Sequence, residues 1–370
     1  MPRPADALGK PQRLTIAAAG ALTAAAGVMA GAGAPDVPRF AVAAVALAVL
    51  AVLVGESIEQ IGERLGPGPT GLLQSSLGNL PELFVAIFAL RDGLILVVQA
   101  ALIGSVLGNV LLVLGAAFLS GGARHGAQRF RPEAPRMLVT LLALAGGATL
   151  VPTLAVRLET PAAHHAVALS DVAAIVLLAV YVTSIPFWLS GGPEMSSPPQ
   201  AARARRGRAT AAGTVRPQWP LGLAIGVLAG AGLASGAASD WFVSALTPAT
   251  RSLGISPMFT GLVIVALASN AVENAAGIRF AWKARPDFAI STILNSPLQI
   301  TLLLTPVLVL ISPLLGPAHL TLVFPPLLVV ALAVAVVVVA IVVYDGEYSW
   351  LEGVALIALY VIIAAALWWG

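Results

Sequence analysis

The sequence predicts an all-α polytopic membrane protein with about eleven transmembrane helices, one N-terminal span followed by two inverted five-helix repeats. Three observations support this fold class. Of the 370 residues, 58% are hydrophobic and only 10% are charged, whereas a soluble domain carries about 25% charged residues. The apolar residues fall into stretches long enough to cross a bilayer. Two of these stretches contain the same polar motif, Asn-x-x-Glu, at residues 79–82 and 270–273.

A transmembrane helix needs about 20 mostly apolar residues. The chain offers eleven such stretches, at residues 14–33, 39–63, 69–90, 94–119, 137–156, 167–190, 219–242, 256–282, 287–313, 320–343 and 350–369. A hydrophilic stretch rich in Pro, Ser and Arg lies between the sixth and the seventh and predicts a linker loop. The expected divisions are an extra N-terminal span, a first repeat, a basic cytoplasmic linker and a second repeat, at residues 1–36, 37–190, 191–217 and 218–370.

The basic residues predict the orientation of the helices, because cytoplasmic loops carry an excess of Lys and Arg. With a cytoplasmic N-terminus, all but four of the 20 Lys and Arg lie in cytoplasmic segments, the exceptions being Arg39, Arg91, Arg157 and Arg251. The motif helices are then the third and eighth spans, which cross the membrane in opposite directions, as inverted repeats require. We therefore expect a multi-pass protein of the bacterial cytoplasmic membrane, with the lipid bilayer as its surroundings.

The two motifs predict a buried site for a cation. Each residue of the second motif lies 191 positions after its counterpart in the first, and Ser105 and Ser296 keep the same offset. In a continuous helix, residues three apart share a face, so each Asn is expected to stack beside its Glu. Inverted symmetry would bring Glu82 and Glu273 together near the bilayer midplane. An ionisable residue at this depth is usually functional.

The chemistry of these residues favours a hard cation that exchanges with protons. Carboxylate, amide and carbonyl oxygens suit Ca²⁺, and the chain has no Cys and only four His for a softer metal. Two carboxylates in a dry interior must be neutralised when the cation leaves. Protons can do this, because desolvation and mutual repulsion raise carboxylate pKa values. The sequence thus predicts an antiporter and no enzyme, with no cofactor apart from the transported Ca²⁺ and H⁺.

Further polar residues are expected near the two glutamates. The stretch after each motif carries hydroxyl and amide side chains that we interpret as a supporting shell, namely Gln99, Ser105, Asn295, Ser296 and Gln299. Glu56 and Glu59 share a face near the cytoplasmic end of the second span. They are interpreted either as a solvated helix end or as an access path for the cation and protons.

The residues around both motifs resemble a known family, the cation/proton exchangers of the calcium/cation antiporter superfamily. Three runs are similar to the first alpha-repeat of that family, Gly71–Leu73, Gly78–Leu83 and Val98–Ser105. Three more are similar to the second, Gly254–Pro257, Asn270–Glu273 and Ser296–Gln299. This chain departs from the family at Asn274, where His is usual.

The resemblance implies Ca²⁺/H⁺ exchange by alternating access. It implies that Glu82 and Glu273 are ligands shared by the cation and the protons. It also implies that Asn79, Asn270 and the carbonyl groups of Gly78 and Ser269 complete the cation site.

Other functions remain as alternatives. Oxygen ligands do not fix the ion, so Na⁺/H⁺ or Na⁺/Ca²⁺ exchange stays open. A polytopic membrane enzyme would need a nucleophile–base pair or a His cluster, and only His164 and His165 occur together. A passive channel would use a multisubunit pore or repeated carbonyl loops, and nothing in the sequence resembles either. The charges are scattered over loops, so no nucleic acid partner is expected, while a homo-oligomer stays open.

The predicted topology can be tested with single cysteines, because the chain has no Cys of its own. Cysteines at Ser197 and after Gly370 should react with a membrane-impermeant maleimide from opposite sides of the membrane. The first is expected in the cytoplasm and the second outside, with the Cys-free protein as the control. Labelling of both from one side would contradict eleven spans.

Overall fold

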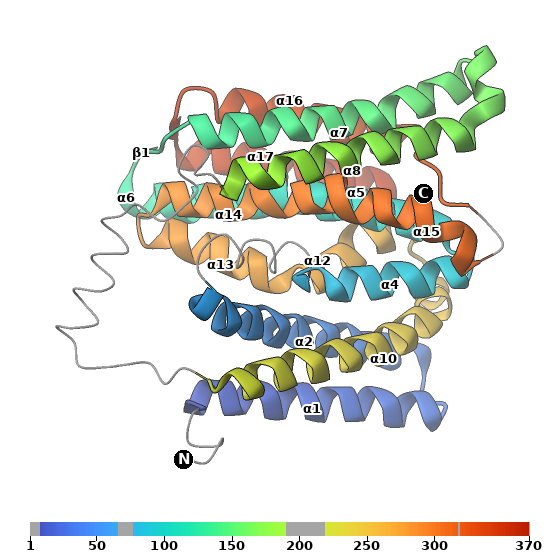
Figure 1. Ribbon diagram of the computed structural model, residues 1–370, viewed down its shortest axis with the longest axis vertical. Helices are drawn as coiled ribbons and strands as arrows, with labels where there is room; N and C mark the ends of the chain where they lie inside the picture. Colours follow the sequence, from blue (N-terminus) through green and yellow to red (C-terminus); the bar gives the residue numbers. More distant parts are fainter. Residues whose placement is uncertain (1–7, 66–76, 190–218, 317–318, 370) are drawn as a thin grey trace.

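A computed structural model describes residues 8–65, 77–189, 219–316 and 319–369, and Figure 1 shows a bundle of long, roughly parallel helices. The side chains of residues 63, 65, 187–189 and 271–273 also lie outside the description. The elements of the first half are α1 (Lys10–Gly31), α2 (Asp36–Leu65), α4 (Leu80–Arg91), α5 (Ile95–Leu107), η2 (Gly108–Val113), α6 (Leu114–His125), β1 (Gln128–Arg129), α7 (Glu133–Arg157), η3 (Pro161–His165) and α8 (Ala166–Leu189). Those of the second half are α10 (Leu221–Leu253), α11 (Pro257–Phe259), η4 (Thr260–Val265), α12 (Ala266–Ser269), α13 (Ala271–Trp282), α14 (Pro286–Gln299), η5 (Ile300–Leu304), α15 (Thr305–Leu315), α16 (Pro326–Val342), β2 (Glu347–Tyr348) and α17 (Trp350–Trp368).

Each of the eleven predicted stretches contains helix where it is described, which confirms the all-α polytopic class. Eight helices of the described residues are long and apolar enough to cross a bilayer, or nine if a bent pair in the second half forms one span. The remaining helices α4 and α16 are shorter, with 12 and 17 residues. Residues 69–76 of the third predicted span lie outside the described residues. The count of eleven therefore stays a prediction.

The expectation of continuous motif helices is wrong, because each helix breaks at its asparagine. Asn79 and Asn270 both leave the helical conformation, with φ/ψ of −93°/20° and −98°/8°. In the second copy, the helices on either side of the break are bent by 66°. Asparagine is favoured at the position before a helix, and Pro81 in the first turn of α4 cannot continue a preceding helix. Each Asn therefore precedes a new helix that carries its Glu in the first turn.

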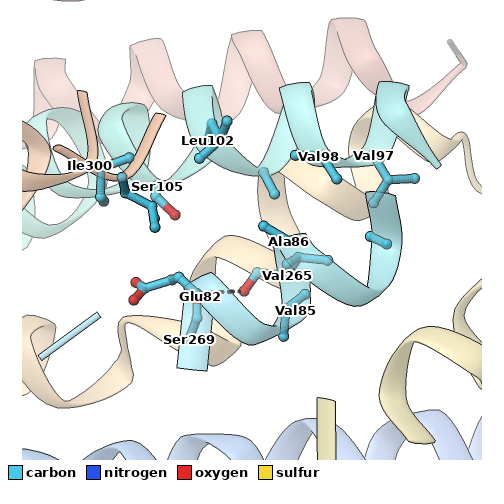
Figure 2. A pocket seen from close by; sticks show the side chains of 13 residues that line it. Glu82, Val85, Ala86, Val97, Val98, Leu102, Ser105, Val265, Ser269 and Ile300 are labelled. Atoms are coloured by element: carbon cyan, nitrogen blue, oxygen red, sulfur yellow. Dashed lines mark hydrogen bonds between the residues drawn. The ribbon is translucent and has the colours of Figure 1, made fainter. Parts of the chain in front are cut away.

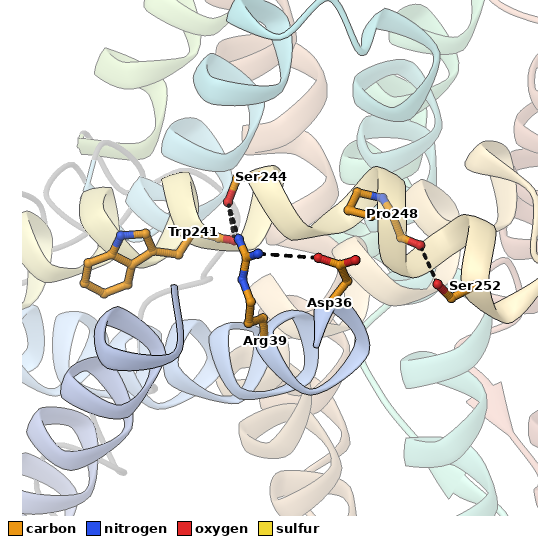
Figure 3. Close-up of polar contacts among 6 residues, drawn as sticks. All are labelled: Asp36, Arg39, Trp241, Ser244, Pro248 and Ser252. Carbon is orange, nitrogen blue, oxygen red and sulfur yellow. Dashed lines mark hydrogen bonds and ion pairs between the residues drawn. The ribbon is translucent and has the colours of Figure 1, made fainter. Parts of the chain in front are cut away.

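Helices α1, α2 and α10 pack together along one side of the bundle (Figure 1). Near the start of α2, Arg39 pairs with Asp36 at 3.4 Å and donates to Ser244 Oγ of α10 at 3.4 Å (Figure 3). At the other end of α2, the Trp219 N–H donates to Gln60 Oε1 at 3.1 Å, and Arg64 donates to the Trp219 carbonyl. Polar contacts thus join α2 and α10 at both ends.

The centre of the bundle is the helix α5–η2–α6. In its most apolar stretch 83% of the residues are buried, against 11% in the corresponding stretch of α1. The central helix crosses η4 at two glycines. A Cβ atom on Gly104 would lie 2.7 Å from the carbonyl carbon of Leu262, and one on Gly261 would lie 2.5 Å from the Val97 oxygen. Small residues allow such close approach between membrane helices. The crossing brings α5 against the helix that leads into the second motif.

A short two-stranded sheet, formed by segments from both halves of the chain, lies at one end of the bundle. Strands β1 and β2 pair antiparallel, and Arg129 forms an ion pair with Glu347 at 3.0 Å. Tyr348 of β2 is buried, with its ring stacked on Phe118 at 4.0 Å. Burial raises the pKa of the Tyr348 hydroxyl to about 12, so this residue stays neutral at physiological pH.

The glycine crossing predicts a site-specific loss of stability. Gly104→Ala places a methyl group against the Leu262 backbone and should destabilise the protein by about 1–3 kcal/mol, as overpacking does. The melting temperature in detergent should fall. Gly108→Ala is the matched control, because a Cβ there meets nothing within 4 Å. Equal melting temperatures for both variants would contradict the close crossing.

Candidate functional site

The break at Asn79 places Glu82 at the start of α4, inside the bundle. Glu82 is the third residue of the helix and is buried, with 9% of its surface exposed. The amino end of a helix carries a partial positive charge that stabilises an anion. The sequence therefore sets a carboxylate in membrane-buried surroundings where the helix itself partly compensates its charge.

The two motif asparagines are held crosswise by the opposite half of the chain. Asn79 Nδ2 donates to Gln299 Oε1 of α14 at 3.2 Å. Asn270 Nδ2 donates to Ser105 Oγ of α5 at 3.1 Å, and Ser296 Oγ donates to Asn270 Oδ1 at 3.4 Å. All five side chains are at least 94% buried. These contacts fix the two breaks close to the helices that follow the opposite motif.

A small pocket opens beside Glu82, between α4 and α5 (Figure 2). Its polar lining residues are Glu82, Ser105 of α5 and Ser269 of α12. The remaining lining residues are apolar, among them Leu102 and Ile300. The pocket thus combines one carboxylate and two hydroxyl groups with apolar walls. Hard oxygen donors in such a setting suit a small cation.

The structure brings several of the predicted site residues together. Hydrogen bonds join Asn79 to Gln299 and join Asn270 to both Ser105 and Ser296, while Glu82 and Ser269 line the pocket.

The Ser269 hydroxyl itself donates to the Val265 carbonyl at 3.0 Å, within its own helix. Gly78 is half-buried in the turn before Asn79. Glu273 is the third residue of α13, the position that Glu82 holds in α4, but its side chain lies outside the described residues.

Other predicted residues lie apart from the pocket. Gln99 donates to the carbonyls of Thr321 and Val323, on a different segment. Asn295 is half-buried in α14 and is not among the residues that line the pocket. Glu56 and Glu59 lie in the last third of α2, the first half-buried and the second exposed.

One buried residue was not among the predicted ligands. Asn109 in the π-helical η2 is 2% exposed, and its Nδ2 donates to the Ser105 carbonyl at 2.8 Å. Its Oδ1 has no hydrogen-bond partner among the described residues. The available signal was its place four residues after Ser105, on the same helix face.

The described side chains include no group of three His, Asp or Glu that could hold a metal ion. Among the described side chains, the acidic group beside the pocket is therefore the carboxylate of Glu82 alone, accompanied by neutral oxygens. The Glu273 side chain lies outside the description.

Known proteins resemble this chain over most of its length. The family model for "Sodium/calcium exchanger protein" matches residues 37–189 and 223–369. A Ca(2+)/H(+) antiporter from Synechocystis is 36% identical, over 88% of this chain and 90% of the relative. The Ca(2+)/H(+) antiporter ChaA of Bacillus subtilis is 33% identical, over 89% and 92%.

Two solved structures are also similar to this chain. The structure of native YfkE has a TM-score of 0.79 at 29% identity, covering 96% of this chain and 99% of that one. The H+/Ca2+ exchanger CAX has a TM-score of 0.70 at 17% identity, covering 97% of this chain and 92% of that one, a likeness of fold. The match extends over both halves of the sequence and of the structure, and the chain belongs to the sodium/calcium exchanger protein family.

Proposed function

We propose that this protein is a secondary antiporter that exchanges Ca²⁺ for H⁺ across the cytoplasmic membrane by alternating access. The observation that carries the proposal is the crosswise bonding of Asn79 and Asn270 beside the buried Glu82 and its pocket. The relatives named as Ca(2+)/H(+) antiporters, which align over nearly the whole chain, support the choice of ions.

The two halves act as inverted repeats in this proposal. Asn79 and Asn270 share nearly the same backbone conformation, and α4 and α13 each have 12 residues. In both halves the next long helix becomes π-helical shortly after the matching serine, in η2 after Ser105 and in η5 after Ser296. Broken helices that meet at the bilayer midplane are a recurrent basis of transport sites. An N-terminus in the cytoplasm would follow from the distribution of Arg and Lys.

Glu82 and Glu273 supply the charge for the cation in this mechanism. Asn79, Asn270 and the carbonyls of Gly78 and Ser269 add neutral oxygens, and the unpartnered Oδ1 of buried Asn109 is a further candidate. When Ca²⁺ leaves, each carboxylate takes up a proton, because two bare negative charges are costly in an apolar interior. The carboxylates therefore carry either Ca²⁺ or protons through the change of access.

Glu56 and Glu59 extend this site toward the cytoplasm in the proposal. They lie on the part of α2 nearest its carboxyl end, and α2 packs against both α12 and α13. Acidic side chains at this place would attract a cation toward the second motif. Their role is secondary to that of Glu82.

The carboxylates can be tested by isosteric substitution. Glu82→Gln and Glu273→Gln should each reduce Ca²⁺ uptake by about a hundredfold or more, a larger loss than the 10–100-fold typical of residues that only support a metal ligand. The amide keeps the shape but supplies no charge and releases no proton. The measurement is Ca²⁺ uptake into proteoliposomes driven by an imposed pH gradient.

Glu133→Gln is the matched control, since this residue also lies in the first turn of a helix but is exposed. Its uptake should equal that of the wild type. Near-normal uptake by either motif variant would contradict the assignment of that glutamate. Uptake of Na⁺ and not Ca²⁺ by the wild type would favour Na⁺/H⁺ exchange.

Competition at one site also predicts a pH dependence. Protonation removes the ligands, so the apparent Ca²⁺ affinity should fall as the pH falls. Because the two carboxyl groups titrate as a coupled pair, the slope of log affinity against pH should approach two at low pH. An affinity that stays constant between about pH 5 and 8 would contradict shared ligands.

A further inference from the structure

An extended strap precedes α16 and contributes buried side chains to the bundle. Residues 319–325 are not helical, and alternate side chains point into the core, with Leu320, Leu322 and Phe324 at most 2% exposed. An extended backbone inside a membrane protein needs hydrogen-bond partners from the protein itself. The strap, residues 319–325, is not part of the β1–β2 sheet.

Side chains of four helices supply these partners. The N–H groups of Leu320, Leu322 and Phe324 donate to hydroxyl oxygens of α15, α8 and α7 at 2.9–3.0 Å, those of Ser312, Ser170 and Thr153. On the other edge, the Thr321 and Val323 carbonyls both accept from Gln99 Nε2 of α5, at 3.2 and 2.8 Å. The strap thus contacts α15, which precedes it in the chain, and also α5, α7 and α8 of the first half.

Gln99 is the residue through which α5 is hydrogen-bonded to the described strap. Its amide nitrogen carries two hydrogens, one for each carbonyl. The Gln99 side chain is buried, with 6% of its surface exposed. These two bonds fix both the rotation of α5 about its axis and its position along it.

The helix held in this way also carries the site. Ser105 follows Gln99 by six residues in the same continuous helix, about 9 Å along the axis. Ser105 Oγ accepts the bond from Asn270, and Val98 and Leu102 form a wall of the Glu82 pocket. A shift of α5 at Gln99 is therefore transmitted to the contact between the two halves.

We infer that Gln99 is a positioning residue, which anchors α5 to the strap and so holds Ser105 opposite Asn270. Gln99 therefore does not belong to the shell around the cation, where the sequence placed it. The effect of Gln99 on transport rests on the proposed function, but its role in holding α5 in position does not.

Cysteine cross-linking tests the geometric claim directly, because the chain has no Cys. The pair Ser105→Cys and Asn270→Cys places two thiols at side chains that touch, and an oxidant joins them only while the two helices stay in position. Gln99→Met removes both donors at nearly constant volume. It should slow the cross-linking by about threefold or more, because contacting residues are commonly coupled by that amount.

Ser312→Ala is the matched control, since it removes one bond from the far end of the strap and leaves α5 anchored. It should lower the melting temperature without changing the cross-linking rate. An unchanged rate in Gln99→Met, or an equal fall in both variants, would overturn the inference. If Gln99→Met does not purify as folded protein, Gln99→His, which keeps one N–H donor, provides the comparison, with a rate below that of the parent pair expected.

Transport is measured separately. Gln99→Met should raise the Ca²⁺ concentration for half-maximal uptake more than it lowers the maximal rate. Absence of Ca²⁺ uptake in the wild type would refute the proposed function, while the cross-linking rates would still decide the role of Gln99.

Discussion

The structure depends on how two breaks in membrane-buried helices are stabilised. A break exposes backbone and polar side-chain groups in surroundings without water, where each unsatisfied group costs free energy. Here Asn79 bonds to Gln299 of the other half. Asn270 bonds to Ser105 of the other half, and also to Ser296 and the Ala266 carbonyl of its own half. One bond from each motif asparagine thus joins its break to the opposite half of the chain.

The same arrangement explains how a carboxylate persists in the membrane. Glu82 lies in the first turn of α4, where the partial positive charge of the helix end favours the anion, and beside a pocket that leaves room for a cation. The close crossing of α5 and η4 at Gly104 and Gly261 keeps the walls of that pocket near each other. A site of this kind is stable when it is occupied by a cation or by protons and costly when it is empty. That difference is the physical basis for coupling in an exchanger.

The sequence predicted the helical class and the family from signals that can be read without the fold. Apolar length, charge bias and the 191-residue offset each depend on the chain alone. The breaks were missed, although Asn79 and Pro81 together are typical of a helix start, because the apolar pattern continues through them. The partner of Gln99 could not be predicted, because it lies more than 220 residues away, on a strap without a motif. Asn109 was not among the predicted ligands, and its burial becomes visible only when η2 packs against its neighbours.

Proton release on Ca²⁺ binding tests the central claim most directly, namely that one pair of carboxylates holds either Ca²⁺ or protons. Calorimetric titration of the purified protein in buffers of different ionisation enthalpy gives the number of protons released per bound ion. At a pH where the free site is protonated, shared carboxylates should release close to two protons for each Ca²⁺ that binds. Binding of Ca²⁺ with no release of protons at any pH between about 5 and 8 would contradict it.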